Sequence, residues 1–397
     1  MSRITEVRGF VVKMDQSYLG GTAQVDLPGQ RGDYVRHQKY RSSYSTKSET
    51  FLVRITTDDG TYGWGEAQAP LVPEVAATIV ERLLGPFLLG RDPFDTQSIW
   101  MDNYDAMRER GHVNGYHLDA VAAIDIALWD LKGKLLGASV ATLMGGRLRQ
   151  QVPCYVSGLS APDDDTRVAS VTKWADQGFT EFKLPLGNGA AADARSFAAV
   201  RRALGDDATI NVDLHWRYSV PDAITLGRRM EEHGLGFYEA PVAPEDSLGQ
   251  AEVAAALAAS VAIGEELRTR YDFRDRLVKR SADVLQPDVG RMGITEVMGV
   301  SALAEAFHVS LALHLGVGLG IYIAAGVQVA AATRNVQTME FQPGQLNVGN
   351  ALLKQPVECA SGWYTVPEGP GLGVDVDLDT LQTHTTSSFA LTETGQG

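Results

Sequence analysis

Carboxylate and imidazole side chains recur at a regular interval through the second half of the chain. Six of them, 23 to 26 residues apart, each end a short apolar run: Asp213, Glu239, Glu265, Asp288, His314 and Glu340. Lys183 ends the run before the first of them. An interval of this length fits one strand and one helix, so the side chains would gather where the strand ends of a barrel meet.

Three of these positions suit a hard metal ion. Asp213, Glu239 and one carboxylate of the Glu265-Glu266 pair offer only oxygen ligands, the set that magnesium prefers, whereas zinc favours nitrogen and sulfur. Successive strand residues face opposite sides, so only one glutamate of the pair can point inward. The residues alone leave open which one it is.

His314 and Asp288 end neighbouring runs and could form a base dyad. An aspartate that accepts from one imidazole nitrogen leaves the other nitrogen free to take a proton. Lys183 could neutralise a substrate carboxylate, act as a base if its pKa is depressed, or simply reach solvent at the rim.

His215 stands two residues after Asp213, so strand alternation would project both side chains to the same side. It is either a second acid–base group or a hydrogen-bonded rim histidine. His112 and His117 could reach a site from the preceding helix, although no spacing indicates it. The run LGVGLG at 315–320 is not GxGxxG and favours a loop for close substrate approach over a dinucleotide site.

For these residues to form one site, the fold must bring the ends of several strands close together. From Gln151 onward, short apolar runs alternate with Ala-rich, charged helical stretches, which predicts a parallel, closed βα barrel. The eight runs are VPCYVSG, TEFKLPLG, TINVDLHW, FYEAPV, VAIGEEL, DVLQPDVG, VSLALHLG and QTMEF. The chain before them predicts antiparallel strands over 4–14 and 51–57 and from 62, and helices over 74–84 and 118–136.

A long polar segment, 16–48, separates the first two of these strands and has no helical period. A structureless loop of that length in a compact protein is usually functional, often a lid, and a disordered insertion is the alternative.

The amino-acid composition limits the kinds of binding partner that the protein can have. The 397 residues carry 49 acidic and 35 basic side chains, a formal net charge of -14, which opposes a nucleic-acid or anionic-membrane partner. Cys154 and Cys359 have no CxxC or Cys/His spacing, so neither a disulfide framework nor a zinc site is expected. The N-terminus lacks the basic, long apolar and small-residue sections of a secretory signal peptide. No run reaches the 18 uncharged apolar residues of a transmembrane helix, so we expect a cytoplasmic protein.

The chain resembles the mandelate racemase subgroup of the enolase superfamily over nearly its whole length. The matching blocks are GWGEA at 63–67, AAIDIALWDLKGK at 122–134, GFTEFKLPLG at 178–187, VDLH at 212–215, YEAPVAPE at 238–245, IGEE at 263–266, LQPDVGRMGITE at 285–296, His314, MEF at 339–341 and PEGPGLGVDVD at 367–377. The resemblance implies an α/β fold, a modified (β/α)7β TIM-like barrel at 126–345 under an α+β capping domain at 1–125 that is completed by 346–397.

The resemblance also implies a role for each residue at the barrel mouth. Asp213, Glu239 and Glu265 would hold Mg²⁺, which selects Glu265 over its neighbour. Asp288 and His314 would form the base dyad, Glu340 would hydrogen-bond the enediolate, and Lys183 would stabilise the substrate carboxylate. Lys or His bases beside magnesium are a known arrangement of enolase-superfamily sites.

Pro185 is the main departure from the family pattern. Many members carry Lys-x-Lys on the second strand, whereas here Lys183 is followed by Leu184 and a proline that can hold no proton. Two-base racemisation is therefore not expected. Asp213-Leu214-His215 is instead similar to the Asp-x-His of D-galactonate and D-mannonate dehydratases, in which the histidine expels the β-hydroxyl.

The predicted reaction is therefore an acid sugar dehydration: His314 removes the C2 proton, His215 protonates the departing 3-hydroxyl, and a 2-keto-3-deoxy acid forms. Substrate contacts are expected from the 16–48 loop, through Arg31, Arg36, His37, Lys39 and Arg41. Alternatives are an epimerase, racemase or lactone cycloisomerase of the same superfamily, a Schiff-base aldolase using Lys183, and a non-catalytic binding protein. We expect a homo-oligomer that acts on a small-molecule carboxylate.

Overall fold

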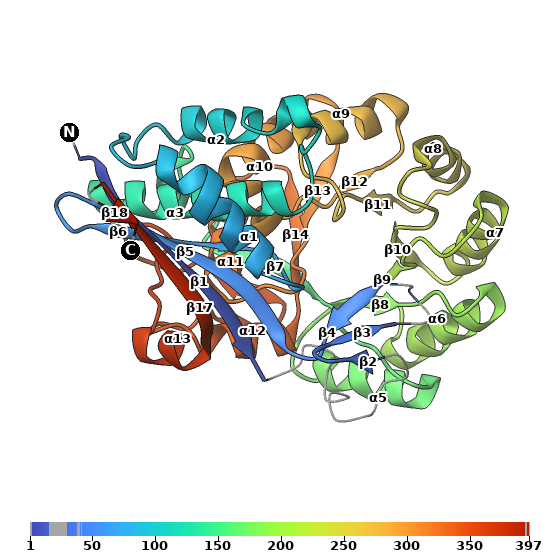
Figure 1. Cartoon of the computed structure of the whole chain (residues 1–397). Helices are drawn as coiled ribbons and strands as arrows, with labels where there is room; N and C mark the ends of the chain where they lie inside the picture. The colour runs from blue at the N-terminus through green and yellow to red at the C-terminus, as the bar shows by residue number, and fades with distance from the viewer. Residues whose placement is uncertain (1, 16–29, 38–39, 41, 394, 397) are drawn as a thin grey trace.

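The computed structural model of the chain describes residues 2–15, 30–37, 40, 42–393 and 395–396. An antiparallel sheet with helices lies beside a parallel barrel (Figure 1). The sheet has the strand order β18-β17-β1-β5-β6. Its strands are β1 (Ile4–Met14), β5 (Ser48–Thr57), β6 (Tyr62–Ala67), β17 (Thr385–Thr392) and β18 (Gly395–Gln396). The C-terminal β17 pairs with β1, so both ends of the chain build this cap sheet.

Helices α1 (Glu74–Ile79) and α3 (Tyr116–Leu136) pack on the cap sheet, and α2 (Thr96–Asp105) packs on α3. Helix α1 continues as a π-helical segment, Val80–Leu84. The helices and strands predicted here are confirmed to within a few residues. Gly63 and Gly65 let β6 lie directly on α3, because a Cβ at either position would collide with the backbone of Ala127 or Ala123.

The predicted barrel is confirmed. Eight parallel strands run in sequence order and β14 pairs with β7 to close the cylinder. They are β7 (Gln151–Val156), β8 (Glu181–Pro185), β9 (Thr209–Asp213), β10 (Leu235–Glu239), β11 (Val261–Ile263), β12 (Val284–Leu285), β13 (Ser310–Leu313) and β14 (Val336–Phe341). Each apolar run of the sequence supplies one strand.

Helices connect successive strands around the outside of the barrel (Figure 1). They are α5 (Asp164–Ala175), α6 (Ala190–Leu204), α7 (Val220–Glu231), α8 (Ser247–Ala256), α9 (Arg270–Lys279), α10 (Val289–Ala306) and α11 (Gly320–Ala332). The remaining helices are α4 (Val140–Leu143), α12 (Pro343–Asn350) and α13 (Leu378–His384). Because α3 and α10 pack on each other, the cap and the barrel share an apolar interface. The domain boundaries at residues 125 and 345 stay a prediction.

The described part of the 16–48 segment is not the structureless loop that we predicted. It contains a small antiparallel sheet of β2 (Gln30–Arg31), β3 (Tyr34–Arg36) and β4 (Ser43–Ser45). Its first residues, 16–29, and the predicted substrate contacts Lys39 and Arg41 lie outside the described residues. These strands are two or three residues long, and so short a stretch within a polar segment shows no alternation of apolar and polar residues from which a strand could be predicted.

The two cysteines, 205 residues apart, are free thiols whose Sγ atoms lie 3.4 Å apart. Cys154 is on β7, and Cys359 is on β15 (Cys359–Ala360), which is joined to β7 through β16 (Trp363–Thr365). Among the helices of the described ranges, none has the length and apolar character needed to cross a membrane.

Candidate active site at the barrel mouth

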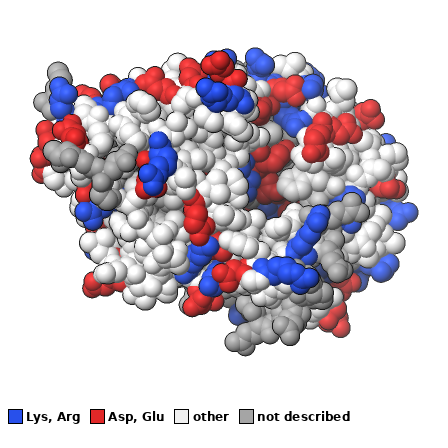
Figure 2. Space-filling model, in the orientation of Figure 1, with Lys and Arg blue, Asp and Glu red and all other residues white. Residues whose placement is uncertain are grey.

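The predicted site residues lie at the carboxyl ends of the barrel strands. Asp213 and Glu239 end β9 and β10 and are directly paired across the two strands. Glu340 lies on β14 opposite Tyr155, and His314 follows the last residue of β13. Figure 2 shows acidic side chains in a hollow on the face where the barrel strands lie in Figure 1.

His314 and Asp288 are in hydrogen-bond contact. Nδ1 of His314 lies 2.6 Å from Oδ2 of Asp288, and Oδ1 of Asp288 accepts from the backbone N–H of Gly290 at 2.9 Å. Both side chains are buried. Burial would lower the pKa of His314, but the charges of Glu265 and Glu340, together with the bond to Asp288, raise it to about 10. The other ring nitrogen, Nε2, lies 3.7 Å from Oε2 of Glu340.

Glu265 is the glutamate of its pair that meets the dyad. Its Oε2 lies 2.7 Å from Nε2 of His314. Burial disfavours its charge, but the charge and hydrogen bond of His314 outweigh burial and lower the pKa of Glu265. The two carboxylate oxygens of Glu266 are buried and have no hydrogen-bond partner among the described residues.

Lys183 is enclosed rather than solvated at the rim. Its Nζ lies 3.0 Å from Glu239 and 3.1 Å from Glu340, and its side chain is 5 % exposed. Burial alone would lower the pKa of Lys183, but the charges of Glu239 and Glu340 raise it well above its usual value. A Schiff base needs a neutral amine, so this environment opposes the aldolase alternative.

The predicted metal ligands are crowded but do not converge. Burial raises the pKa of Asp213 to about 7, and that of Glu239 to about 8, against the opposing charge of Lys183. In the part of the chain that the structure describes, no three His, Cys, Asp or Glu side chains meet closely enough to hold a metal ion. Each carboxylate is instead engaged by a neighbour: Asp213 by the backbone of His215, Glu239 by Lys183 and Gln286, and Glu265 by His314.

His215 lies beside Asp213, but strand alternation does not place it there. The strand β9 ends at Asp213, and His215 has a positive φ of 49°. Its Nδ1 lies 3.1 Å from Oδ1 of Asp213 without forming a hydrogen bond, and its ring stacks on Tyr40 with 4.1 Å between centroids. Burial lowers the pKa of His215.

The small sheet contributes aromatic side chains that we did not predict. Tyr40 covers His215 and is itself stacked on His37, with 4.8 Å between the ring centroids. Burial raises the pKa of Tyr44, and the charges of Glu265 and Asp213 raise it further, so this phenol lies near the carboxylates. The one available signal was the cluster of tyrosines between the polar residues of 34–44.

Two of the basic residues that we predicted to contact substrate from the 16–48 segment lie exposed on the small sheet. They are Arg31 and Arg36, and Arg31 donates to the backbone oxygen of Gln30. Of the two earlier histidines, His112 is exposed, whereas His117 is buried and bonded to the backbone oxygen of Asn103 on α2.

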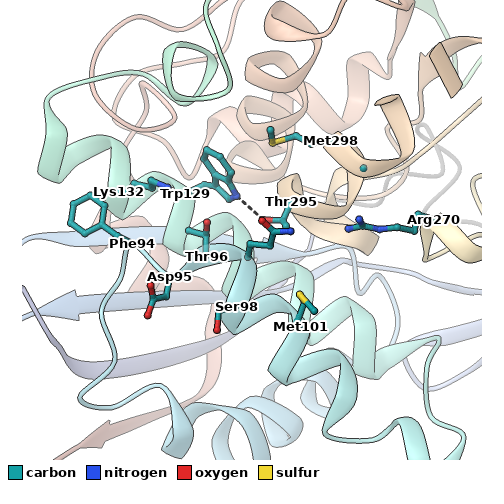
Figure 3. Close-up of a pocket in the computed structure, with 12 residues that line it drawn as sticks. Phe94, Asp95, Thr96, Ser98, Met101, Trp129, Lys132, Arg270, Thr295 and Met298 are labelled. Carbon is teal, nitrogen blue, oxygen red and sulfur yellow. Dashed lines mark hydrogen bonds between the residues drawn. The ribbon is translucent and has the colours of Figure 1, made fainter. Parts of the chain in front are cut away.

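Of two cavities formed by the described residues, the smaller adjoins the barrel mouth. A cavity of about 480 Å³ is lined by the loop after β8 and by Arg217 and Tyr218. A larger one, about 750 Å³, lies between α2, α3, α9 and α10, where Trp129 points to Thr295 and donates to its hydroxyl at 2.9 Å (Figure 3). It contains no predicted site residue, so we assign the chemistry to the mouth.

Family models match most of the chain. Residues 35–145 match the model of the mandelate racemase / muconate lactonizing enzyme N-terminal domain, and residues 166–380 match the enolase C-terminal domain-like model. The first begins within β3 and covers β4, β5, β6 and the helices α1 to α3 of the cap, and the second covers the barrel from within α5 onward.

Individual proteins are similar over most of their length. D-galactarolactone cycloisomerase of Agrobacterium fabrum is 38% identical over 83% of this chain and 89% of its own, and D-galactonate dehydratase of Klebsiella pneumoniae is 34% identical over the same shares. The crystal structure of an enolase-superfamily member from Agrobacterium tumefaciens has a TM-score of 0.91 and 34% identity, covering 96% of this chain and 98% of that one.

Proposed function

Because the chain belongs to the mandelate racemase / muconate lactonizing enzyme family of the enolase superfamily, we propose that it is an enzyme that removes the proton beside the carboxylate of an acid sugar. The observation that carries the proposal is the contact between His314 and Asp288, 2.6 Å, at the mouth of the barrel. The two similar proteins both act on acid sugars or their lactones, by their names.

His314 is the proposed base. Asp288 holds Nδ1 and fixes the ring, so that Nε2 is the nitrogen that accepts the C2 proton. Lys183 and Glu340 lie 3.1 Å apart, and Glu340 lies 3.7 Å from Nε2 of His314. There the ammonium would offset the negative charge that grows on the substrate carboxylate, and Glu340 would hydrogen-bond the enediolate.

Asp213, Glu239 and Glu265 are the residues that would hold Mg²⁺. The set suits a divalent cation chemically because it supplies three carboxylates. Burial and the charges of neighbouring carboxylates raise the pKa values of Asp213 and Glu239, and a bound cation would relieve that cost. The three side chains would have to draw together, because in this structure each is engaged by a neighbour. Bound Mg²⁺ would supply a Lewis acid for the substrate carboxylate. With Glu265 engaged as a ligand, Nε2 of His314 would be left free to accept a proton.

Dehydration is the reaction we propose first. Once His314 has taken the C2 proton, a proton from His215 would let the 3-hydroxyl leave as water, and the resulting enol would tautomerise to a 2-keto-3-deoxy acid. His215 is supported as the donor by its place beside Asp213 at the mouth.

Opening of an acid sugar lactone is the second candidate, and two observations favour it. The cycloisomerase is 38% identical to this chain, and burial lowers the pKa of His215, which leaves a neutral ring that is a weaker acid. A lactone oxygen bound to the β-carbon leaves as a carboxylate and needs no proton. Epimerisation is less well supported, because Pro185 provides no base on the second strand.

The two reactions differ in product mass. Aldonates, aldarates and their lactones would be incubated with the enzyme and magnesium, and the products weighed by mass spectrometry. Loss of water from an acid supports dehydration, whereas conversion of a lactone at constant mass supports ring opening. If His314→Asn converts a substrate as fast as the parent, the proposed base is wrong.

Other expectations stay predictions. They include substrate contacts from Arg31, Arg36, His37, Lys39 and Arg41, a cytoplasmic location and a homo-oligomer, the last of which sedimentation of the purified protein would test.

A further inference from the structure

A buried tyrosine completes the hydrogen bonds of the dyad. Tyr322, in the first turn of α11, is 1 % exposed, and its hydroxyl donates to Oδ2 of Asp288 at 2.7 Å. The same oxygen meets Nδ1 of His314 at 2.6 Å. With the N–H of Gly290 on Oδ1, three donors surround the carboxylate, and Tyr322 is the one supplied by a side chain outside the dyad.

The hydroxyl of Tyr322 is itself oriented. The backbone N–H of Gly316 donates to it at 2.9 Å, so the phenolic proton is free for an acceptor. Oδ2 of Asp288, at 2.7 Å, is closer than the backbone oxygen of His314, at 3.3 Å. The backbone N–H of Tyr322 donates to Glu66 of the cap at 2.8 Å, which fixes the start of α11. Both ends of the residue are therefore held by hydrogen bonds.

Glycines clear the space that the ring occupies. A Cβ at Gly290 would come within 2.8 Å of the ring of Tyr322, and one at Gly318 would collide with it. At Gly316 a Cβ would meet the ring of His314 at 2.8 Å. The LGVGLG run, which we interpreted as a loop for substrate approach, thus makes room for the tyrosine beside the dyad.

We propose that Tyr322 is a positioning residue for the Asp288–His314 dyad. Its hydroxyl holds Asp288 in the rotamer that meets Nδ1, which keeps Nε2 aimed at the substrate. The inference rests on the proposed function in that His314 is the base. Without this hydroxyl the carboxylate loses one of its three donors and can turn away from His314.

The first test is Tyr322→Phe, which keeps the ring in its slot and removes only the hydroxyl. Partners that orient metal-bound histidines are commonly worth about 10-fold to 100-fold in activity. By analogy, kcat should fall by that factor while KM stays within about twofold. Tyr238→Phe is the matched control: Tyr238 is also buried, and its hydroxyl donates to the backbone oxygen of Ala223 at 2.9 Å. Equal kcat values for the two variants would overturn the proposal.

The second test needs no substrate. In protein labelled with ¹⁵N-histidine and supplied with magnesium, the ring signals of His314 are those that disappear in His314→Asn. They should move in Tyr322→Phe and stay fixed in Tyr238→Phe. Unmoved signals in Tyr322→Phe would overturn the positioning role even if the proposed reaction is correct. Full activity of His314→Asn would instead refute the proposed function, and the ring signals would still decide the role of Tyr322.

Discussion

The carboxylate of Glu66, at the end of the cap sheet, accepts the backbone N–H of Tyr322 at 2.8 Å. It also accepts the N–H of Leu319 and the hydroxyl of Thr50. A residue of the capping domain therefore accepts the N-terminal N–H groups of the barrel helix α11. The first turn of this helix carries Tyr322, which contacts Asp288. The cap and the base dyad are joined by a short chain of hydrogen bonds.

Burial raises the pKa of Glu66 to about 7, which predicts a pH-dependent stability. The folded protein keeps this proton up to about pH 7, whereas the unfolded chain loses it near the ordinary glutamate pKa of 4.5. The stabilisation is therefore present at low pH and falls as pH rises between these values. At about 1.4 kcal/mol per pKa unit, the loss is up to about 3 kcal/mol. The destabilisation caused by Glu66→Gln should consequently be larger at pH 5 than at pH 8.

Denaturant unfolding at the two pH values measures this difference. Glu252→Gln, on the exposed face of α8, should change the free energy of unfolding little at either pH. A destabilisation by Glu66→Gln that grows with pH would mean that Glu66 is already ionised in the fold at pH 5.

Metal removal should abolish activity. Chelator is expected to stop turnover and magnesium or manganese to restore it, and Glu239→Gln should lose turnover while remaining folded by circular dichroism. Glu181→Gln is the matched control, because Glu181 begins β8 at the opposite end of the barrel and accepts from Asn211 and Thr338. Undiminished turnover in chelator would exclude the metal assignment.

Pro185 predicts that one face of the substrate has no base. A 2-hydroxy acid with a single stereocentre and no leaving group should exchange its C2 proton with deuterated water yet keep its configuration. Chiral chromatography together with proton NMR would follow both. Inversion at that centre would show that a residue other than position 185 delivers a proton to the second face.

The sequence predicted the barrel and its mouth because each strand end carries its own signal. An apolar run that ends in Asp213 or Glu239 predicts both the strand and the carboxylate at its carboxyl end. This prediction depends on local sequence and needs no knowledge of distant contacts. The register of the barrel then places the predicted residues around one mouth. The resemblance selected Glu265 over Glu266, and in the structure it is Glu265 that contacts His314.

The features that the sequence did not predict depend on contacts between distant segments. Tyr322 lies 34 residues from Asp288, and nothing in its own helix indicates that its hydroxyl turns toward the dyad. Cys154 and Cys359 come together only because β16 pairs with β7. The stacking of Tyr40 on His215 likewise needs the small sheet to fold over the mouth.

The two histidines at the mouth have separable roles in the dehydration we propose. Loss of His314 removes the base, so neither C2 exchange nor product should form. Loss of His215 removes the acid, so dehydration should fall by about 10²-fold to 10⁴-fold while C2 exchange continues. Opening of a lactone, which needs no acid, should survive His215→Asn.

Proton NMR of an acid sugar substrate in deuterated water, with magnesium and either the parent enzyme, His314→Asn or His215→Asn, tests the central claim most directly. We predict that the C2 proton signal disappears with the parent and with His215→Asn and persists with His314→Asn. Exchange of the C2 proton by folded His314→Asn at the parent rate would contradict the assignment of His314 as the base.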